Sequence, residues 1–101
     1  MVYKVEVAPR VSDILIRYAE KFASDNVIEC ALNLTNSFDE AVDSLAEMPE
    51  RGVRKIKYIP KRYHIINFWK HLGLVYQISE MNHTVYIDFL IDDHSDYGKL
   101  F

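Results

Sequence analysis

Three runs of residues in the second half of the sequence predict a three-stranded antiparallel sheet. They span residues 63–69, 72–78 and 84–91, and β-branched and aromatic residues fill all three. Such residues favour a half-buried pleated surface. Two residues separate the first pair of runs and five separate the second pair, and both breaks are of hairpin length. We therefore expect a meander of sequential antiparallel neighbours.

Alternation along these runs predicts one apolar face and one mixed face. Successive side chains of a strand point to opposite sides of the sheet. A sheet that is packed on one side only shows this pattern. In the first run, apolar residues occur at both the odd and the even positions. The pattern therefore does not assign which of its faces points inward. The predicted apolar face carries Leu72, Leu74, Tyr76 and Ile78 from the middle run, and Val85, Ile87, Phe89 and Ile91 from the last.

A short strand and a first helix are predicted before the meander. Residues 2–8 alternate, and Pro9 ends this strand because a proline cannot donate a hydrogen bond to a ladder. Ser12 is the expected N-cap of the helix that follows. The apolar residues of this helix recur at spacings of three and four, as in an amphipathic helix: Val11, Ile14, Leu15, Tyr18, Ala19 and Phe22.

A second helix is predicted from about residue 27 to residue 48, where Pro49 stops it. The polar residues 24–26 interrupt the helical pattern before it and can provide its cap. Its apolar stripe consists of Ala31, Leu34, Phe38, Ala41, Val42 and Leu45.

The order of elements predicts an α+β fold in a single domain over residues 1–101. It consists of an N-terminal strand, an αα-hairpin and a three- to four-stranded antiparallel meander. We expect the helix pair to cover the apolar face of the sheet through Leu15, Phe22, Leu34, Phe38 and Leu45.

Composition narrows the class of protein. Half of the residues are hydrophobic and 27% are charged, as in an ordinary globular domain. The single cysteine excludes a disulfide framework, and the four histidines lack the spacing of zinc ligands. No Gly-rich phosphate loop occurs, and no apolar run approaches the roughly 20 residues of a membrane helix. We therefore expect a cytoplasmic protein with no metal, no cofactor and no membrane contact.

Positive charge is concentrated between the helices and the meander. Residues 50–62 hold half of the twelve Lys and Arg in a chain of net charge −3, and Glu50 is the only acid among them. Residues 53–59 alternate loosely, so a short strand and an extended arm both fit. This basic segment is either a solvated connector or a surface for RNA or an acidic partner. Its cations are Arg51, Arg54, Lys55, Lys57, Lys61 and Arg62.

The order and spacing of several short motifs are similar to those of a known family. A strand Tyr-Lys-Val-Glu-Val (3–7) ends before Pro9, and a helix hairpin ends in Leu-Ala-Glu-Met-Pro-Glu-Arg-Gly (45–52). The core Gly-Leu-Val-Tyr-Gln-Ile (73–78) precedes Val-Tyr-Ile-Asp-Phe-Leu (85–90), and the tail (94–101) reads His-Ser-Asp-Tyr-Gly-Lys-Leu-Phe. Over essentially the whole chain this resembles the RelE/ParE superfamily. Its members are the toxins of bacterial type II toxin–antitoxin modules, also called plasmid-stabilisation proteins.

The resemblance implies helices packed on a twisted sheet and a cognate antitoxin that wraps the toxin. Operator DNA would be contacted only through that antitoxin. The resemblance also implies one of two modes of action. RelE-like members are mRNA interferases, endoribonucleases that cleave ribosome-bound messenger RNA, whereas ParE-like members inhibit DNA gyrase. Many members carry an arginine where Gly73 and His94 stand in this sequence.

Candidate catalytic residues follow from what metal-free RNA cleavage requires. A base activates the 2′-hydroxyl, cations stabilise the phosphorane, and an acid protonates the leaving oxygen. His94 and Tyr97 are the proton-transfer candidates, and Arg62 is the catalytic cation. His64 and His71 are held in reserve. Alternatively, His94 is a turn residue that caps the last strand, and Tyr97 packs on the sheet.

The leading hypothesis is a RelE-like endonuclease that inhibits translation. A ParE-like gyrase inhibitor and a non-catalytic relative that only binds an antitoxin are the alternatives. The functional cleft is predicted on the sheet face away from the helices, between the basic segment and the tail. Phe68 and Trp69, beside Lys70, either form an exposed stacking platform or are buried in the core or in an antitoxin groove.

Overall fold

The structure, a computed structural model, describes residues 2–51 and 62–92, with the backbone alone at Arg51. The helices and the strands follow in the predicted order. The elements are β1 (Lys4–Val7), α1 (Pro9–Ser24), α2 (Ile28–Glu47), the short 3-10 helix η1 (Pro49–Arg51), β2 (Tyr63–Trp69), β3 (Leu72–Ser79) and β4 (Thr84–Asp92). The predicted α+β fold is confirmed.

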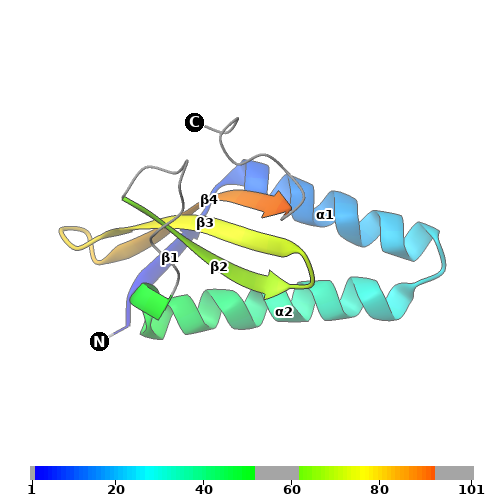
Figure 1. Cartoon of the computed structure of the whole chain (residues 1–101), viewed down its shortest axis with the longest axis horizontal. Helices are drawn as coiled ribbons and strands as arrows, with labels where there is room; N and C mark the ends of the chain where they lie inside the picture. Colours follow the sequence, from blue (N-terminus) through cyan, green and yellow to red (C-terminus); the bar gives the residue numbers. More distant parts are fainter. Residues whose placement is uncertain (1, 52–61, 93–101) are drawn as a thin grey trace.

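The strands form one sheet in the order β1-β4-β3-β2. Pairs β2–β3 and β3–β4 are antiparallel, which confirms the meander, and β1 pairs with β4 in parallel. Figure 1 shows α1 and α2 as a helical hairpin beside this sheet. The buried core contains residues of both helices and of β2, β3 and β4, so the hairpin covers one face of the sheet.

The start of α1 differs from the prediction. Ser12 is not the N-cap: the helix begins at Pro9, and Ala8, which is in an extended conformation, takes the cap position without a side-chain hydrogen bond. Proline suits the first helical position because its fixed φ is helical and its missing N–H would have no partner inside the helix. The Ala8 carbonyl accepts hydrogen bonds from the backbone N–H groups of Val11 and Ser12, at 2.9 and 3.3 Å.

The turn between the helices also departs from the predicted capping. Val27 occupies the N-cap position of α2, and no side chain of residues 24–26 caps the helix. Asn26 instead adopts a left-handed φ of 61°, a conformation that asparagine tolerates better than most residues. The backbone N–H groups of Asn26 and Val27 then donate to the carbonyls of Ala23 and Phe22. The reversal therefore rests on backbone bonds.

The predicted packing of the helices is confirmed. Leu34 and Leu45 are fully buried and Phe38 is 8% exposed, while Leu15 and Phe22 pack against the same core from α1. Phe68 meets Phe38 edge to face at 5.8 Å between ring centroids, and Trp69 meets Phe22 at 5.5 Å. The alternative of an exposed Phe68–Trp69 platform is therefore wrong, because both rings pack against the helices.

Two irregularities in strand register assign the faces of the sheet. Asn67 pairs with Gly73 and Trp69 with Leu72, which leaves Phe68 as an extra residue in β2. This explains how Phe68 and Trp69, although neighbours, both reach the helix side. In β4, Ile87 pairs with Tyr76 and Phe89 with Val75, so Asp88 is the extra residue.

The bulge at Asp88 overturns the predicted grouping of β4. Val85 and Ile87 belong to the core under the helices, but Phe89 and Ile91 belong to a separate cluster with Tyr63, Ile65 and Val75. Leu90, predicted to face away from the helices, takes their place in the core. An inserted residue reverses the inward and outward order of all residues that follow it.

Leu34→Ala tests the core, with Leu32→Ala as a matched control on the same helix. Leu34 is fully buried and Leu32 is 56% exposed. We expect Leu34→Ala to lower the free energy of unfolding by about 2–5 kcal/mol, because the truncation leaves a cavity. Leu32→Ala should change it by less than about 0.5 kcal/mol. Urea unfolding followed by circular dichroism measures both, and equal losses would contradict this core.

Candidate functional site

Most of the predicted site residues lie outside the described parts of the chain. These are Arg54, Lys55, Lys57, Lys61, His94 and Tyr97, and the possible strand or arm at residues 53–59 lies there as well. Arg51 lies in η1 at the start of the basic segment, and its side chain is not described. Arg62 directly precedes β2. The site assigned to His94, Tyr97 and Arg62 therefore stays a prediction.

The sheet face opposite the helices carries the second apolar cluster, which consists of Tyr63, Ile65, Val75, Phe89 and Ile91. Val75 is fully buried and Ile91 is 4% exposed. Tyr63 and Phe89 meet edge to face, 6.2 Å between ring centroids. This part of the predicted cleft is thus a packed apolar surface.

Gly73 lies within this second cluster. A Cβ atom built on Gly73 would lie 3.5 Å from Ile91 Cγ1 and 3.6 Å from Ile65 Cγ2, both ordinary van der Waals distances. The backbone carbonyl oxygen of Ile66 is nearest, at 3.4 Å, so a methyl group would fit. The side chains nearest to position 73 are thus apolar, and the glycine itself supplies no cation there.

Two arginines lie at the margin of the second cluster, each over an aromatic ring. The Arg62 guanidinium carbon is 4.9 Å from the Tyr63 ring centroid, and that of Arg10 is 4.3 Å from the Phe89 ring centroid. Both distances are within the range of cation–π attraction. The predicted site residue Arg62 thus lies next to the helix-free face. Arg10, which the sequence analysis did not identify, lies there as well.

Arg10 reaches the sheet because β1 is short. Its Nε donates to the Asp88 carbonyl at 2.7 Å, just beyond the point where β1 stops pairing with β4. Asp88 is also the bulge residue, and its Oδ2 accepts a hydrogen bond from Gln77 Nε2 at 2.8 Å. Arg10 thus binds the edge of β4 just past the last residue of β4 that pairs with β1.

The reserve histidines do not join this face. His64 is 5% exposed and stacks on Tyr76, which belongs to the core under the helices, at 5.2 Å between ring centroids. His71 lies in the exposed turn between β2 and β3. The described part of the helix-free face therefore offers the cations Arg10 and Arg62 at its margin. Proton transfer by His94 and Tyr97 stays a prediction.

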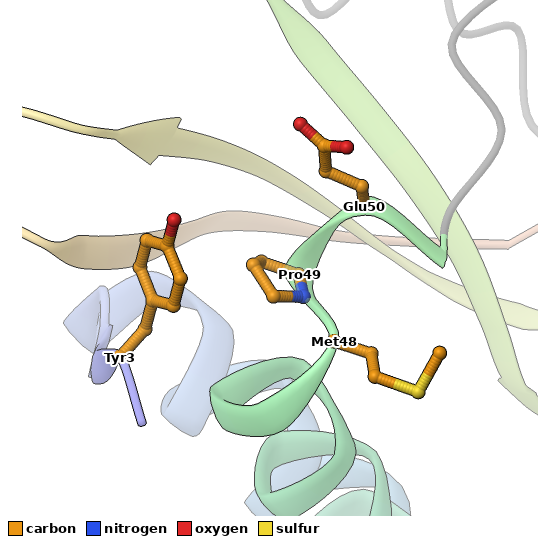
Figure 2. Close-up of a pocket in the computed structure, with 4 residues that line it drawn as sticks. All are labelled: Tyr3, Met48, Pro49 and Glu50. Atoms are coloured by element: carbon orange, nitrogen blue, oxygen red, sulfur yellow. The ribbon is translucent and has the colours of Figure 1, made fainter. Parts of the chain in front are cut away.

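A separate pocket of ≈ 500 Å³ lies where β1 approaches the end of α2 (Figure 2). Its described lining residues are Tyr3, Met48, Pro49 and Glu50. The Tyr3 hydroxyl donates to the Glu80 carboxylate at 2.8 Å. This hydrogen bond, followed by desolvation and the charges of Glu80 and Glu50, raises the pKa of Tyr3. The described lining of the pocket thus combines one carboxylate, Glu50, with partly apolar side chains.

Residues 2–51 and 62–92 contain no cluster of three or more potential metal ligands. None of the helices in these residues is long and apolar enough to span a membrane.

Comparisons with known proteins identify the fold. No protein-family model matches the sequence, and no curated protein matches it. Among solved structures, a chain of the toxin–antitoxin complex RelBE2 from Mycobacterium tuberculosis is 16% identical, with a TM-score of 0.65 over 91% of this chain and 99% of that chain. A chain of the chromosomal ParDE toxin–antitoxin system from P. aeruginosa is 11% identical, with a TM-score of 0.72 over 90% of this chain and 96% of that chain.

The chain has the RelE/ParE toxin fold. Both similarities extend over nearly the whole of each chain, so the fold accounts for β1, the helical hairpin and the meander together. At these identities the likeness establishes the fold and leaves the target of this RelE/ParE-like chain open.

Arg10→Ala tests the arginine at the edge of β4. We expect the free energy of unfolding to fall by about 0.5–1.5 kcal/mol, because the Asp88 carbonyl loses its hydrogen bond. Arg10→Lys should lose most of the same stability, since lysine lacks the planar guanidinium group whose Nε–H makes this hydrogen bond. Arg17→Ala, at another exposed position of α1, is the control. If urea unfolding shows equal effects for Arg10→Ala and Arg17→Ala, the contact contributes nothing.

Proposed function

We propose that this protein is the toxin component of a type II toxin–antitoxin module. The observation that supports this proposal is the RelE/ParE toxin fold, which is similar over nearly its whole length to chains of two toxin–antitoxin assemblies. A cognate antitoxin is the partner that such a module requires. Both targets considered below, the ribosome and gyrase, place the proposed toxin in the cytoplasm.

For the mode of action, we infer a ParE-like effect on a protein target such as DNA gyrase. The apolar surroundings of Gly73 favour this mode, because a nuclease would need a cation there to hold the phosphate. The described cations at this face, Arg10 and Arg62, stack on aromatic rings. Arginine is also enriched among residues that dominate protein–protein binding.

RelE-like cleavage of ribosome-bound mRNA is the second candidate. It is favoured by the concentration of positive charge in residues 50–62 of an otherwise acidic chain. Its proposed machinery is His94 and Tyr97 for proton transfer, with Arg62 stabilising charge on the phosphorane. Arg51, Arg54, Lys55, Lys57 and Lys61 would bind the RNA or, in either mode, the antitoxin.

Controlled expression with and without the adjacent reading frame tests the module. We expect growth arrest that is relieved when a neighbouring gene product is co-expressed and co-purifies with this protein. Inhibition of gyrase supercoiling, filamentation and a DNA-damage response should accompany the arrest. Primer extension on messenger RNA from translating ribosomes should show no new ends. Growth without arrest under strong expression would contradict the toxin assignment itself.

His94→Ala and Tyr97→Phe separate the two modes. We expect both variants to remain toxic in the gyrase mode. In the mRNA-cleavage mode each should lose about 10²–10⁴-fold in cleavage rate, the usual contribution of a positioned acid or base. His71→Ala and Tyr18→Phe are controls of the same chemistry in the described part of the chain. New mRNA ends that disappear in both test variants but persist in both controls would overturn the gyrase proposal.

A further inference from the structure

Tyr76 connects the sheet to the short helix that follows α2. It is fully buried, and it is the largest side chain of the described residues of which this is true. Its hydroxyl donates to the Pro49 carbonyl in η1 at 2.6 Å, across 27 positions in the sequence. This distance is at the short end of the range for an O–H···O hydrogen bond. The bond therefore ties η1 directly to β3.

The ring of the same residue contacts β2. Tyr76 and His64 are direct partners in the β2–β3 ladder, and their rings stack at 5.2 Å between centroids with an interplanar angle of 19°. His64 is 5% exposed, so this contact also lies in the interior. Figure 1 shows η1 and the start of β2 at the same end of the sheet. One buried side chain thus contacts both elements.

Two cations of the predicted site are close in sequence to these contacts. Arg51 follows Pro49 by two residues and ends η1, and Arg62 precedes His64 by two residues at the start of β2. The contacts of Tyr76 therefore fix the backbone near each of these cations. They also fix the position of one relative to the other.

The Pro49 carbonyl depends on the Tyr76 hydroxyl. Pro49 is buried, and a buried carbonyl that loses its hydrogen-bond partner is costly in free energy. Because η1 has only three residues and follows the exposed Met48, a shift of η1 can bring this carbonyl to water. β2 is held by its ladder with β3. Loss of the hydroxyl should therefore move η1 and leave the sheet in place.

We propose that Tyr76 is a positioning residue, which holds η1 against the sheet and so sets the separation of Arg51 from Arg62. Its functional consequence rests on the proposed function, in which both cations contact the RNA or a protein partner. Tyr76 touches neither, because it is fully buried. Without the hydroxyl both cations remain, but they no longer share one geometry. A site whose groups must be ordered on binding loses affinity.

Tyr76→Phe tests the proposal, because it removes the hydroxyl and keeps the ring that stacks on His64. Tyr86→Phe is the matched control on β4, where the hydroxyl accepts a hydrogen bond from Asn82. Leu34→Ala is a second control, because it destabilises the core from α2. Any effect that comes from lower stability alone should be at least as large in Leu34→Ala as in Tyr76→Phe.

The separation of η1 from the sheet is measured with two spin labels. They are attached to cysteines at Glu50, in η1, and at Lys70, in the turn between β2 and β3, after Cys30→Ser removes the native thiol. Electron–electron resonance should show one narrow distance distribution in the otherwise unchanged chain. We expect a broader or shifted distribution in Tyr76→Phe, and an unchanged one in Tyr86→Phe and Leu34→Ala.

Growth arrest on controlled expression of the unlabelled chain is the functional measurement. At equal levels of folded protein, we expect arrest to be lost or weakened in Tyr76→Phe and unchanged in Tyr86→Phe. Circular dichroism establishes that each variant is folded. If the parent chain causes no arrest, the proposed function fails, and the distance measurement still decides whether Tyr76 holds η1.

Three results would overturn the role of Tyr76. One is the same distance distribution in Tyr76→Phe and Tyr86→Phe, and another is equal broadening in Leu34→Ala. The third is a changed distribution with undiminished arrest by Tyr76→Phe. If Tyr76→Phe does not fold, the parent chain decides. Its Tyr76 hydroxyl proton should exchange slowly enough for detection by NMR and show a nuclear Overhauser effect to Pro49, and absence of this signal would contradict the proposal.

Discussion

The extra residue at Asp88 is the constraint on which the arrangement of both sheet faces depends. Before it, Val85 and Ile87 pack under the helices; after it, Phe89 and Ile91 point to the other face. Without the bulge, β4 would deliver all four side chains to the helices and leave the opposite face without two of the five residues of its apolar cluster. The same residue accepts hydrogen bonds from Arg10 and Gln77, so the irregular backbone is stabilised by side chains from α1 and β3.

Long, strongly periodic segments could be predicted from the sequence, because burial of one face imposes a period. This is why the apolar face of β3 and the apolar stripe of α2 agree with the expectation. The bulge could not be predicted in the same way. Residues 87–91 read Ile-Asp-Phe-Leu-Ile, so either setting of the strand places apolar side chains on the helix side. The start of α1 was predicted from Ser12 alone, whereas Pro9, interpreted only as the end of the strand, is the first residue of the helix.

The candidate site was less accessible to sequence reasoning for a physical reason. Charge density along the chain indicates Arg62 and its neighbours, but Arg10 acts on Asp88, which is 78 residues away in the sequence. Contacts of this kind leave no local pattern. The aromatic partners of both arginines belong to a cluster that exists only because β2, β3 and β4 are brought together. The composition of a segment therefore predicts where cations are concentrated. Which of these cations lie over aromatic rings depends on the three-dimensional fold.

The parallel pairing of β1 with β4 has a consequence for synthesis of the protein. Lys4 pairs with Thr84 and Val7 with Ile87. β1 therefore cannot pair until β4 has been synthesised. Contacts between distant parts of a chain form slowly, because a large loop must close before they stabilise anything. On a ribosome, the helical hairpin can form early, but the sheet cannot be completed until β4 has been translated. A nascent chain would therefore present the two helices before it can present the completed sheet, and any surface that needs all four strands would be absent until then.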